Sequence, residues 1–118
     1  MGREIRVDED AVRIRYRGLS TLITLLREVN VPYAEIQSVE VGLGPLPRAS
    51  FRIGESVPGG TVRGRFRVGG RWYFLDLHHR ERAIVITTLP GARFALVAVE
   101  PEADIDPAEL AASIRERL

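Results

Sequence analysis

Arginines at every second position are the feature of this sequence that could do chemistry. In residues 61–68, TVRGRFRV, arginines alternate with small or apolar residues, and two more arginines precede this stretch. On a β-strand, alternate side chains lie on one face about 7 Å apart, and guanidinium groups bind carboxylates and phosphates through paired hydrogen bonds. The candidate anion contacts are Arg48, Arg52, Arg63, Arg65 and Arg67. A solvent-exposed strand face with scattered acids explains the same pattern without a ligand.

A second row of arginines lies near the amino terminus. In residues 11–17, AVRIRYR, Arg13, Arg15 and Arg17 alternate with apolar residues and follow the acidic stretch DED. The same two interpretations apply to this row: anion contacts, or an ordinary solvent-exposed strand face.

The stretch RWYFLDLHH, residues 71–79, holds the residues that could support catalysis or metal binding. His78 and His79 are adjacent, so on a strand they point to opposite faces and cannot bind one metal together. Asp76 and His78 share a face, but the sequence places no serine or threonine beside them and contains no cysteine. We expect polar residues at a strand end, with no catalytic residue, no metal and no cofactor. An enzyme or small-molecule carrier that uses this face is the alternative.

Composition restricts the class of protein. A chain of 118 residues with net charge +1 and no cysteine predicts a single domain over 1–118, without disulfides or zinc–thiolate sites. The small net charge argues against a nucleic-acid partner. The acidic amino-terminal segment is unlike a secretory signal, and LSTLITLL is shorter than the about 20 apolar residues that cross a bilayer. We expect a cytoplasmic protein, with peripheral membrane attachment as an option.

The first part of the chain predicts a hairpin and then a short helix. Period-two alternation places strands at 4–7 and 11–17, joined by the acidic turn. Apolar residues then follow helical spacing over about 19–28, with Ser20 as the N-cap. Pro32 ends the helix and opens a tight turn before a strand at residues 36–41.

Four strands at hairpin spacing are predicted in the second half. The two glycines after TVRGRFRV are typical of a two-residue hairpin turn, and LPGA separates the last two strands. These predicted strands lie within residues 61–68, 71–79, 82–88 and 93–99.

The connection 42–60 is long for a compact domain, so we expect it to be functional or to contain a short element at SFRI. Gly64 is predicted to face inward, where only a small residue fits under a neighbouring strand.

The carboxy-terminal segment predicts a helix at about 107–117. Asp106 is an N-cap candidate, Pro107 suits the first helical position, and Glu109 completes a capping box. The apolar residues of this segment form one stripe, which is typical of a helix that covers the end of a β structure.

Four stretches resemble a known family. VPYAEIQSVEV, residues 31–41, resembles the strand entry of bacterial pleckstrin-homology-like proteins. FRIGESVPGGTVRGRF with WYFLDLHHRERAIVITT resembles the later strands of the same families, and VAVEPEADIDPAELAASI resembles their usual ending. The resemblance implies a mainly β fold: an antiparallel barrel, or two orthogonal sheets of about seven strands, with the 19–28 helix inserted and the last helix as a cap.

The resemblance also implies function. Such domains are not enzymes, and they present surfaces and open-end loops to lipid headgroups, peptides or copies of themselves. We therefore expect a non-catalytic interaction module whose partner is an unidentified protein or a second copy, with edge strands or the inserted helix as the contact. The alternative is a peripheral binder of anionic lipid headgroups or other anions through the five candidate arginines.

Overall fold

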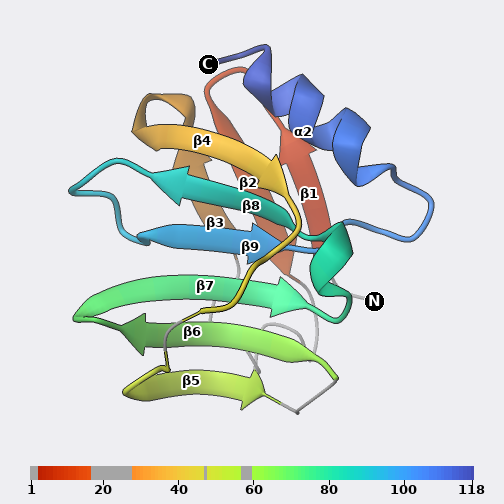
Figure 1. The fold of residues 1–118 in the computed structure, drawn as a ribbon. Helices are drawn as coiled ribbons and strands as arrows, with labels where there is room; N and C mark the ends of the chain where they lie inside the picture. The colour runs from red at the N-terminus through yellow and green to blue at the C-terminus, as the bar shows by residue number, and fades with distance from the viewer. Residues whose placement is uncertain (1–2, 17–27, 47, 57–59) are drawn as a thin grey trace.

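A computed structural model of the chain describes residues 3–16, 28–46, 48–56 and 60–118, and its described part is mainly β with one α-helix at the carboxy terminus (Figure 1). The strands are β1 (Arg3–Val7), β2 (Ala11–Tyr16), β3 (Glu28–Pro32), β4 (Ile36–Val41), β5 (Phe51–Ser56), β6 (Val62–Val68), β7 (Arg71–Leu77), β8 (Ile84–Thr88) and β9 (Leu96–Val99). The 3-10 turns are η1 (Tyr33–Glu35) and η2 (Arg80–Arg82), and the helix is α2 (Pro107–Arg115).

The strands of the described residues form two separate sheets and do not close into a barrel. One sheet has the order β1-β2-β3, and the other has the order β4-β8-β9-β7-β6-β5. In Figure 1 the three-stranded sheet lies behind β4, β8 and β9, and the apolar side chains of the two sheets meet in one buried cluster. The expectation of a mainly β fold with a final helix is confirmed.

The amino-terminal hairpin is confirmed, and its acidic turn has a local role. β1 and β2 pair antiparallel with Ile5 opposite Ile14. Arg13 on β2 donates to Asp8 and to Asp10 in the turn, each at 3.0 Å. The charges of the turn therefore stabilise the hairpin itself.

The predicted helix over 19–28 falls mostly on residues 17–27, which lie outside the described residues. The predicted end of this helix at residue 28 is wrong, because Glu28 is the first residue of β3 and pairs opposite Arg15 of β2. Val29 and Val31 alternate with exposed Asn30 and are 1% and 3% exposed. An apolar residue at every second position is typical of a strand. Residue 29 also fits the helical spacing of the preceding segment, so the two patterns cannot be separated at that position.

The order of the last strands differs from a consecutive antiparallel arrangement. β9 lies between β7 and β8 and runs parallel to β7, with Leu75 opposite Ala98. Val97, Ala98 and Val99 are all at most 2% exposed, which fits a central strand covered on both faces. The described residues contain nine strands rather than about seven, since β3 and β5 come from segments predicted as a helix and a long connection.

The carboxy-terminal helix begins at Pro107 with Asp106 as its N-cap, as predicted, but the hydrogen bonds of the described residues do not include the predicted capping-box contact of Glu109. The carboxylate of Asp106 accepts a hydrogen bond from the Ala108 amide at 3.0 Å, and Pro107 occupies the first helical position. Ala111 and Ile114 are fully buried in the cluster between the sheets, and α2 packs against β4 and β8. The helix therefore covers one end of the core.

The connection between β4 and β5 covers the outer face of the six-stranded sheet. In Figure 1 the yellow part of this connection that follows β4 runs in front of the sheet. Leu43 is buried there in a second apolar cluster with Phe66, Val68 and Leu75. The guanidinium of Arg80 donates to the carbonyl oxygens of Leu43 and Gly44 and fixes the start of the segment.

β5 and β6 approach most closely at two opposed glycines. Gly54 pairs with Gly64, and their φ angles are +136° and +140°, which L side chains rarely adopt. A Cβ on Gly64 would overlap the carbonyl oxygen of Ile53 and lie 2.8 Å from the Cα of Gly54. The prediction that only a small residue fits at Gly64 is confirmed, and the neighbour is the backbone of β5. The predicted inward orientation is wrong, because Gly64 lies opposite Leu75 of the outer apolar cluster, whereas Arg63 and Arg65 lie on the face of the core between the sheets.

Gly64→Ala should lower the free energy of unfolding by about 3 kcal/mol, because it adds backbone strain and a clash with β5. Urea denaturation measures this loss. Gly44→Ala is the control: its φ is ordinary and no heavy atom lies within 4 Å of an added Cβ, so we expect a change within about 0.5 kcal/mol. Equal effects of the two substitutions would contradict the close approach.

Candidate functional site

Four of the five candidate arginines lie on the six-stranded sheet and occupy both of its faces, and Arg48 lies in the connection before β5. Residues paired across an antiparallel ladder share a face, and neighbours along a strand do not. Arg63, Arg65 and Arg67 pair opposite Asp76, Phe74 and Trp72, so they share the face that includes the buried core between the sheets. Arg52 pairs opposite Phe66 on the other face. The structure therefore does not bring all five together.

On the inner face, Arg63 and Arg67 contact neighbouring side chains of β7. Arg63 is only 13% exposed, and its Nε donates to the Oδ1 of Asp76 at 3.0 Å. The guanidinium of Arg67 stacks over the ring of Trp72, 5.5 Å from the ring centroid. Arg65 is half-buried between them. At Arg63 in particular, the guanidinium has a structural partner within the fold.

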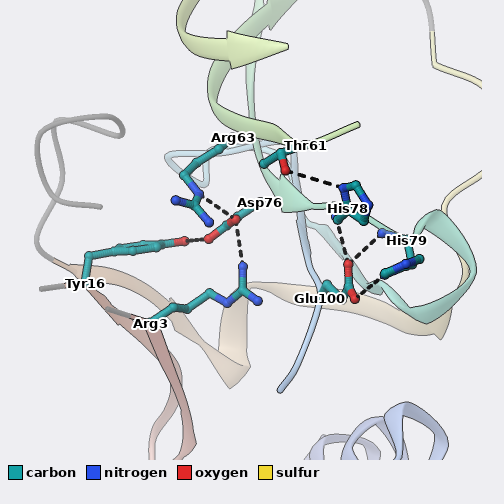
Figure 2. Close-up of polar contacts among 8 residues, drawn as sticks. All are labelled: Arg3, Tyr16, Thr61, Arg63, Asp76, His78, His79 and Glu100. Carbon is teal, nitrogen blue, oxygen red and sulfur yellow. Dashed lines mark hydrogen bonds and ion pairs between the residues drawn. The ribbon is translucent and has the colours of Figure 1, made fainter. Parts of the chain in front are cut away.

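Asp76 is the centre of a buried polar cluster that joins the two sheets (Figure 2). Its side chain is 0% exposed. Its Oδ1 forms ion pairs with two guanidinium groups, that of Arg3 on β1 at 2.7 Å and that of Arg63 on β6. Its Oδ2 accepts a hydrogen bond from the Tyr16 hydroxyl of β2 at 2.7 Å. We call Arg3, Tyr16, Arg63 and Asp76 the Asp76 cluster.

The Tyr16 hydroxyl acts as a hydrogen-bond donor in this cluster. Burial of the phenol, together with the negative charge of Asp76, raises the pKa of Tyr16 far above its usual value. Tyr16 therefore stays protonated and keeps donating to Asp76. The two guanidinium groups balance the charge of Asp76, and the Tyr16 hydroxyl donates to its second oxygen. These contacts link β1 and β2 of one sheet to β6 and β7 of the other.

Asp76→Ala should destabilise the protein by about 3–5 kcal/mol, because it leaves two largely buried guanidinium groups without their counter-ion. Tyr16→Phe removes a single hydrogen bond and should cost about 1–2 kcal/mol. Thermal and urea unfolding measure both values. Asp104→Asn, at an exposed position, should change stability by no more than about 0.5 kcal/mol. The cluster would lose its assigned role if Asp76→Ala cost no more than Tyr16→Phe.

The side chains of Asp76 and His78 do not contact each other, although the strand alternation predicted them on the same face. Asp76 is fully buried in the cluster, whereas His78 is exposed beyond the end of β7. The neighbour of His78 is Thr61, whose Oγ1 lies 3.4 Å from the His78 Nδ1 (Figure 2). Sequence reasoning missed Thr61, yet the signal was present: the two-glycine turn fixes a register that places residue 61 beside residue 78.

The carboxylate near the histidines is Glu100, which follows β9. Its Oε1 accepts hydrogen bonds from the backbone amides of His78 and His79 at 2.8 and 2.7 Å. Its Oε2 lies 3.0 Å from the His79 Nδ1 and 3.7 Å from the Arg82 Nε. Glu100 thus holds the chain as it leaves β7.

Burial of Glu100 opposes its ionisation, but the hydrogen bonds from His79 and His78 outweigh that effect and lower the pKa of Glu100 below its ordinary value. A carboxylate with a lowered pKa stabilises the folded state above its unfolded pKa of 4.5, and this stabilisation is lost as the pH falls below that value.

We therefore expect the free energy of unfolding to fall more steeply below pH 4.5 in the wild type than in Glu100→Gln. Urea unfolding between about pH 6 and about pH 3 tests this. Asp10 and Glu28, whose pKa values are lowered by hydrogen bonds from Arg13 and Arg15, are present in both proteins and cancel. Parallel pH profiles of the two proteins would contradict the role of Glu100.

A cavity of about 480 Å³ lies on the outer face of the six-stranded sheet, beside β5. Its apolar floor comes from β6 and β7, and arginines from the preceding connection, β5 and η2 surround it. We call this site the arginine cavity, and the side chains that matter for its chemistry are Arg48, Arg52, Arg80, Phe66, Val68 and Leu75.

Arg48 and Arg52 are exposed at the arginine cavity. The arginines that form ion pairs within the described residues are others, namely Arg3, Arg6, Arg13, Arg15, Arg63 and Arg82. Arg80 already donates to the connection above the floor. Two guanidinium groups are therefore available to a ligand here, next to an apolar surface.

Comparison with protein-family models, curated proteins and solved structures finds no match to this chain. Within the described ranges, no three His, Asp or Glu side chains are placed to hold a metal ion. The described part of the chain contains no helix that is long and apolar enough to cross a membrane.

Proposed function

We propose that this domain is a non-catalytic binding module that holds an anionic group of its ligand in the arginine cavity. The observation that carries the proposal is the position of Arg48 and Arg52, exposed beside an apolar floor and outside the ion pairs of the described residues. Guanidinium groups bind carboxylates, phosphates and sulfonates, and the volume of about 480 Å³ is in the range of small-ligand sites.

The apolar floor restricts the ligand further. Phe66, Val68 and Leu75 line the cavity and are only 6%, 7% and 5% exposed, so the floor is apolar but offers a small accessible surface. A fully hydrated ion gains nothing from this floor, whereas an anion with an apolar part covers it. The ligand class is therefore an amphipathic anion.

We also propose a pleckstrin-homology-like relationship and a cytoplasmic location, on the strength of the sequence resemblance. Two packed sheets followed by one helix support the relationship. The parallel pairing of β7 with β9 is a departure from a purely antiparallel arrangement. The binding proposal rests on the cavity and not on the family.

Anilinonaphthalene sulfonate tests the cavity, because it combines a sulfonate with an apolar body. We expect saturable fluorescence enhancement that weakens with salt and becomes about tenfold weaker in Arg48→Gln/Arg52→Gln. Arg67→Gln is the matched control, since Arg67 lies on the opposite face, and it should bind like the wild type. Equal affinity of the wild type and the double variant would refute the proposal, as would binding that follows Arg67.

A further inference from the structure

β5 is the outer strand of the six-stranded sheet (Figure 1), and no other described strand pairs with its free edge. Such an edge presents backbone N–H and C=O groups that can pair with an added strand. Phe51, Arg52 and Ser56 of this strand also line the arginine cavity. An edge that can pair and a site that can bind an anion therefore lie side by side.

The two faces of β5 differ in chemistry. The register places Arg52, Gly54 and Ser56 on the cavity face, opposite Phe66, Gly64 and Val62. Phe51, Ile53 and Glu55 lie on the other face. Phe51 is 56% exposed, and its ring meets the Trp72 ring edge-on with centroids 6.1 Å apart. One face thus offers a cation, and the other offers an apolar surface.

We propose that the ligand of the arginine cavity is an extended acidic peptide segment that adds a strand to the free edge of β5. Its acidic side chains lie on the cavity face beside Arg52 and Arg48, and its apolar side chains lie against Phe51 and Ile53. The proposal rests on the proposed function for the role of the two arginines, and it adds the backbone pairing and the chemical class of the partner.

The alternation of the peptide follows from strand geometry. Side chains directly across an antiparallel ladder lie about 4.5–5.5 Å apart, and successive side chains alternate between faces. The peptide residue opposite Arg52 therefore reaches the guanidinium. The peptide residues before and after it lie on the other face, beside Phe51 and Ile53. A strand that alternates acidic and apolar residues satisfies both faces of β5.

A second copy of this chain fits the edge less well. When β5 pairs antiparallel with itself about a two-fold axis, residues on the same face oppose each other. Arg52 would then face Gly54, Ser56 or Arg52 of the second copy, and none of these is acidic. Glu55, the acid of this strand, lies on the other face. Charge complementarity therefore favours a separate acidic strand over self-association.

The direct test uses a capped peptide of about seven residues in which glutamate and valine alternate. Its binding is followed by the fluorescence of Trp72, the single tryptophan of the chain. We expect a shift of the emission to shorter wavelength as valines cover Phe51 and the Trp72 edge. The peptide should also displace anilinonaphthalene sulfonate from the cavity. Each of Arg48→Gln and Arg52→Gln should weaken binding by up to about fivefold.

Two N-methylated peptides test the backbone pairing. Methyl groups on all valine amides block one edge of the added strand, and methyl groups on all glutamate amides block the other. We expect one of these peptides to bind like the parent and the other to lose binding. Equal binding of both, or equal loss in both, overturns strand addition. A peptide with glutamine in place of glutamate should bind more weakly and without salt dependence, and unchanged binding also overturns the proposal.

The outcomes separate this inference from the proposed function. If the sulfonate binds through Arg48 and Arg52 but the alternating peptide does not bind, strand addition is wrong and the cavity proposal stands. If neither probe binds, both are wrong. Light scattering at increasing concentration tests the competing occupant: a dimer that Ile53→Lys dissociates would assign the edge to a second copy and overturn the acidic peptide.

Discussion

The buried carboxylate of Asp76 is the interaction on which the packing of the two sheets depends. A fully buried charge is tolerated in a protein only when other groups replace its lost hydration. Here the replacements come from three strands besides its own: Arg3 from β1, Tyr16 from β2 and Arg63 from β6. Because β1 and β2 belong to the three-stranded sheet, a slip of one sheet against the other would take Arg3 and Tyr16 away from Asp76 and leave it with Arg63 alone. An apolar core alone tolerates such slips more readily than a charge with directed hydrogen bonds.

The position of Asp76 also determines what Arg63 can do. A guanidinium that balances a buried acid cannot leave it for a ligand without leaving that acid uncompensated. Arg67 lies over Trp72 on the same face. Arg13 and Arg15, in the amino-terminal row, are held by Asp8, Asp10 and Glu28. These two residues therefore have the nearby acids that the strand-face interpretation requires, and Arg17 of the same row lies outside the described residues.

The sequence predicted much of the local structure, because hairpins and helix ends are set by near neighbours. The two glycines before β7 define the β6–β7 register, and with it the pairing of Arg63 with Asp76 and of Arg67 with Trp72. The cap of α2 depends on Asp106 and Pro107 alone. In contrast, Arg3 and Tyr16 reach Asp76 from the other sheet. They are far from Asp76 in the sequence, so no local pattern predicts these contacts. The insertion of β9 beside β7 also depends on pairing between distant segments, which period-two alternation does not specify.

The arginine cavity shows why residue type and spacing were insufficient to define a site. Arg48 and Arg52 were grouped with the β6 arginines because they are close in sequence, yet the ladder puts Arg52 on the opposite face. What distinguishes them is the connection between β4 and β5. Leu43 anchors this segment to the outer face and Arg80 fixes its start, and the cavity lies beside its end, next to the outer strand. The close approach of Gly54 and Gly64 holds that outer strand against β6. The same local geometry therefore forms the proposed anion site and leaves an adjacent strand edge open, so a ligand that uses both, as we propose, carries its charge on an extended backbone.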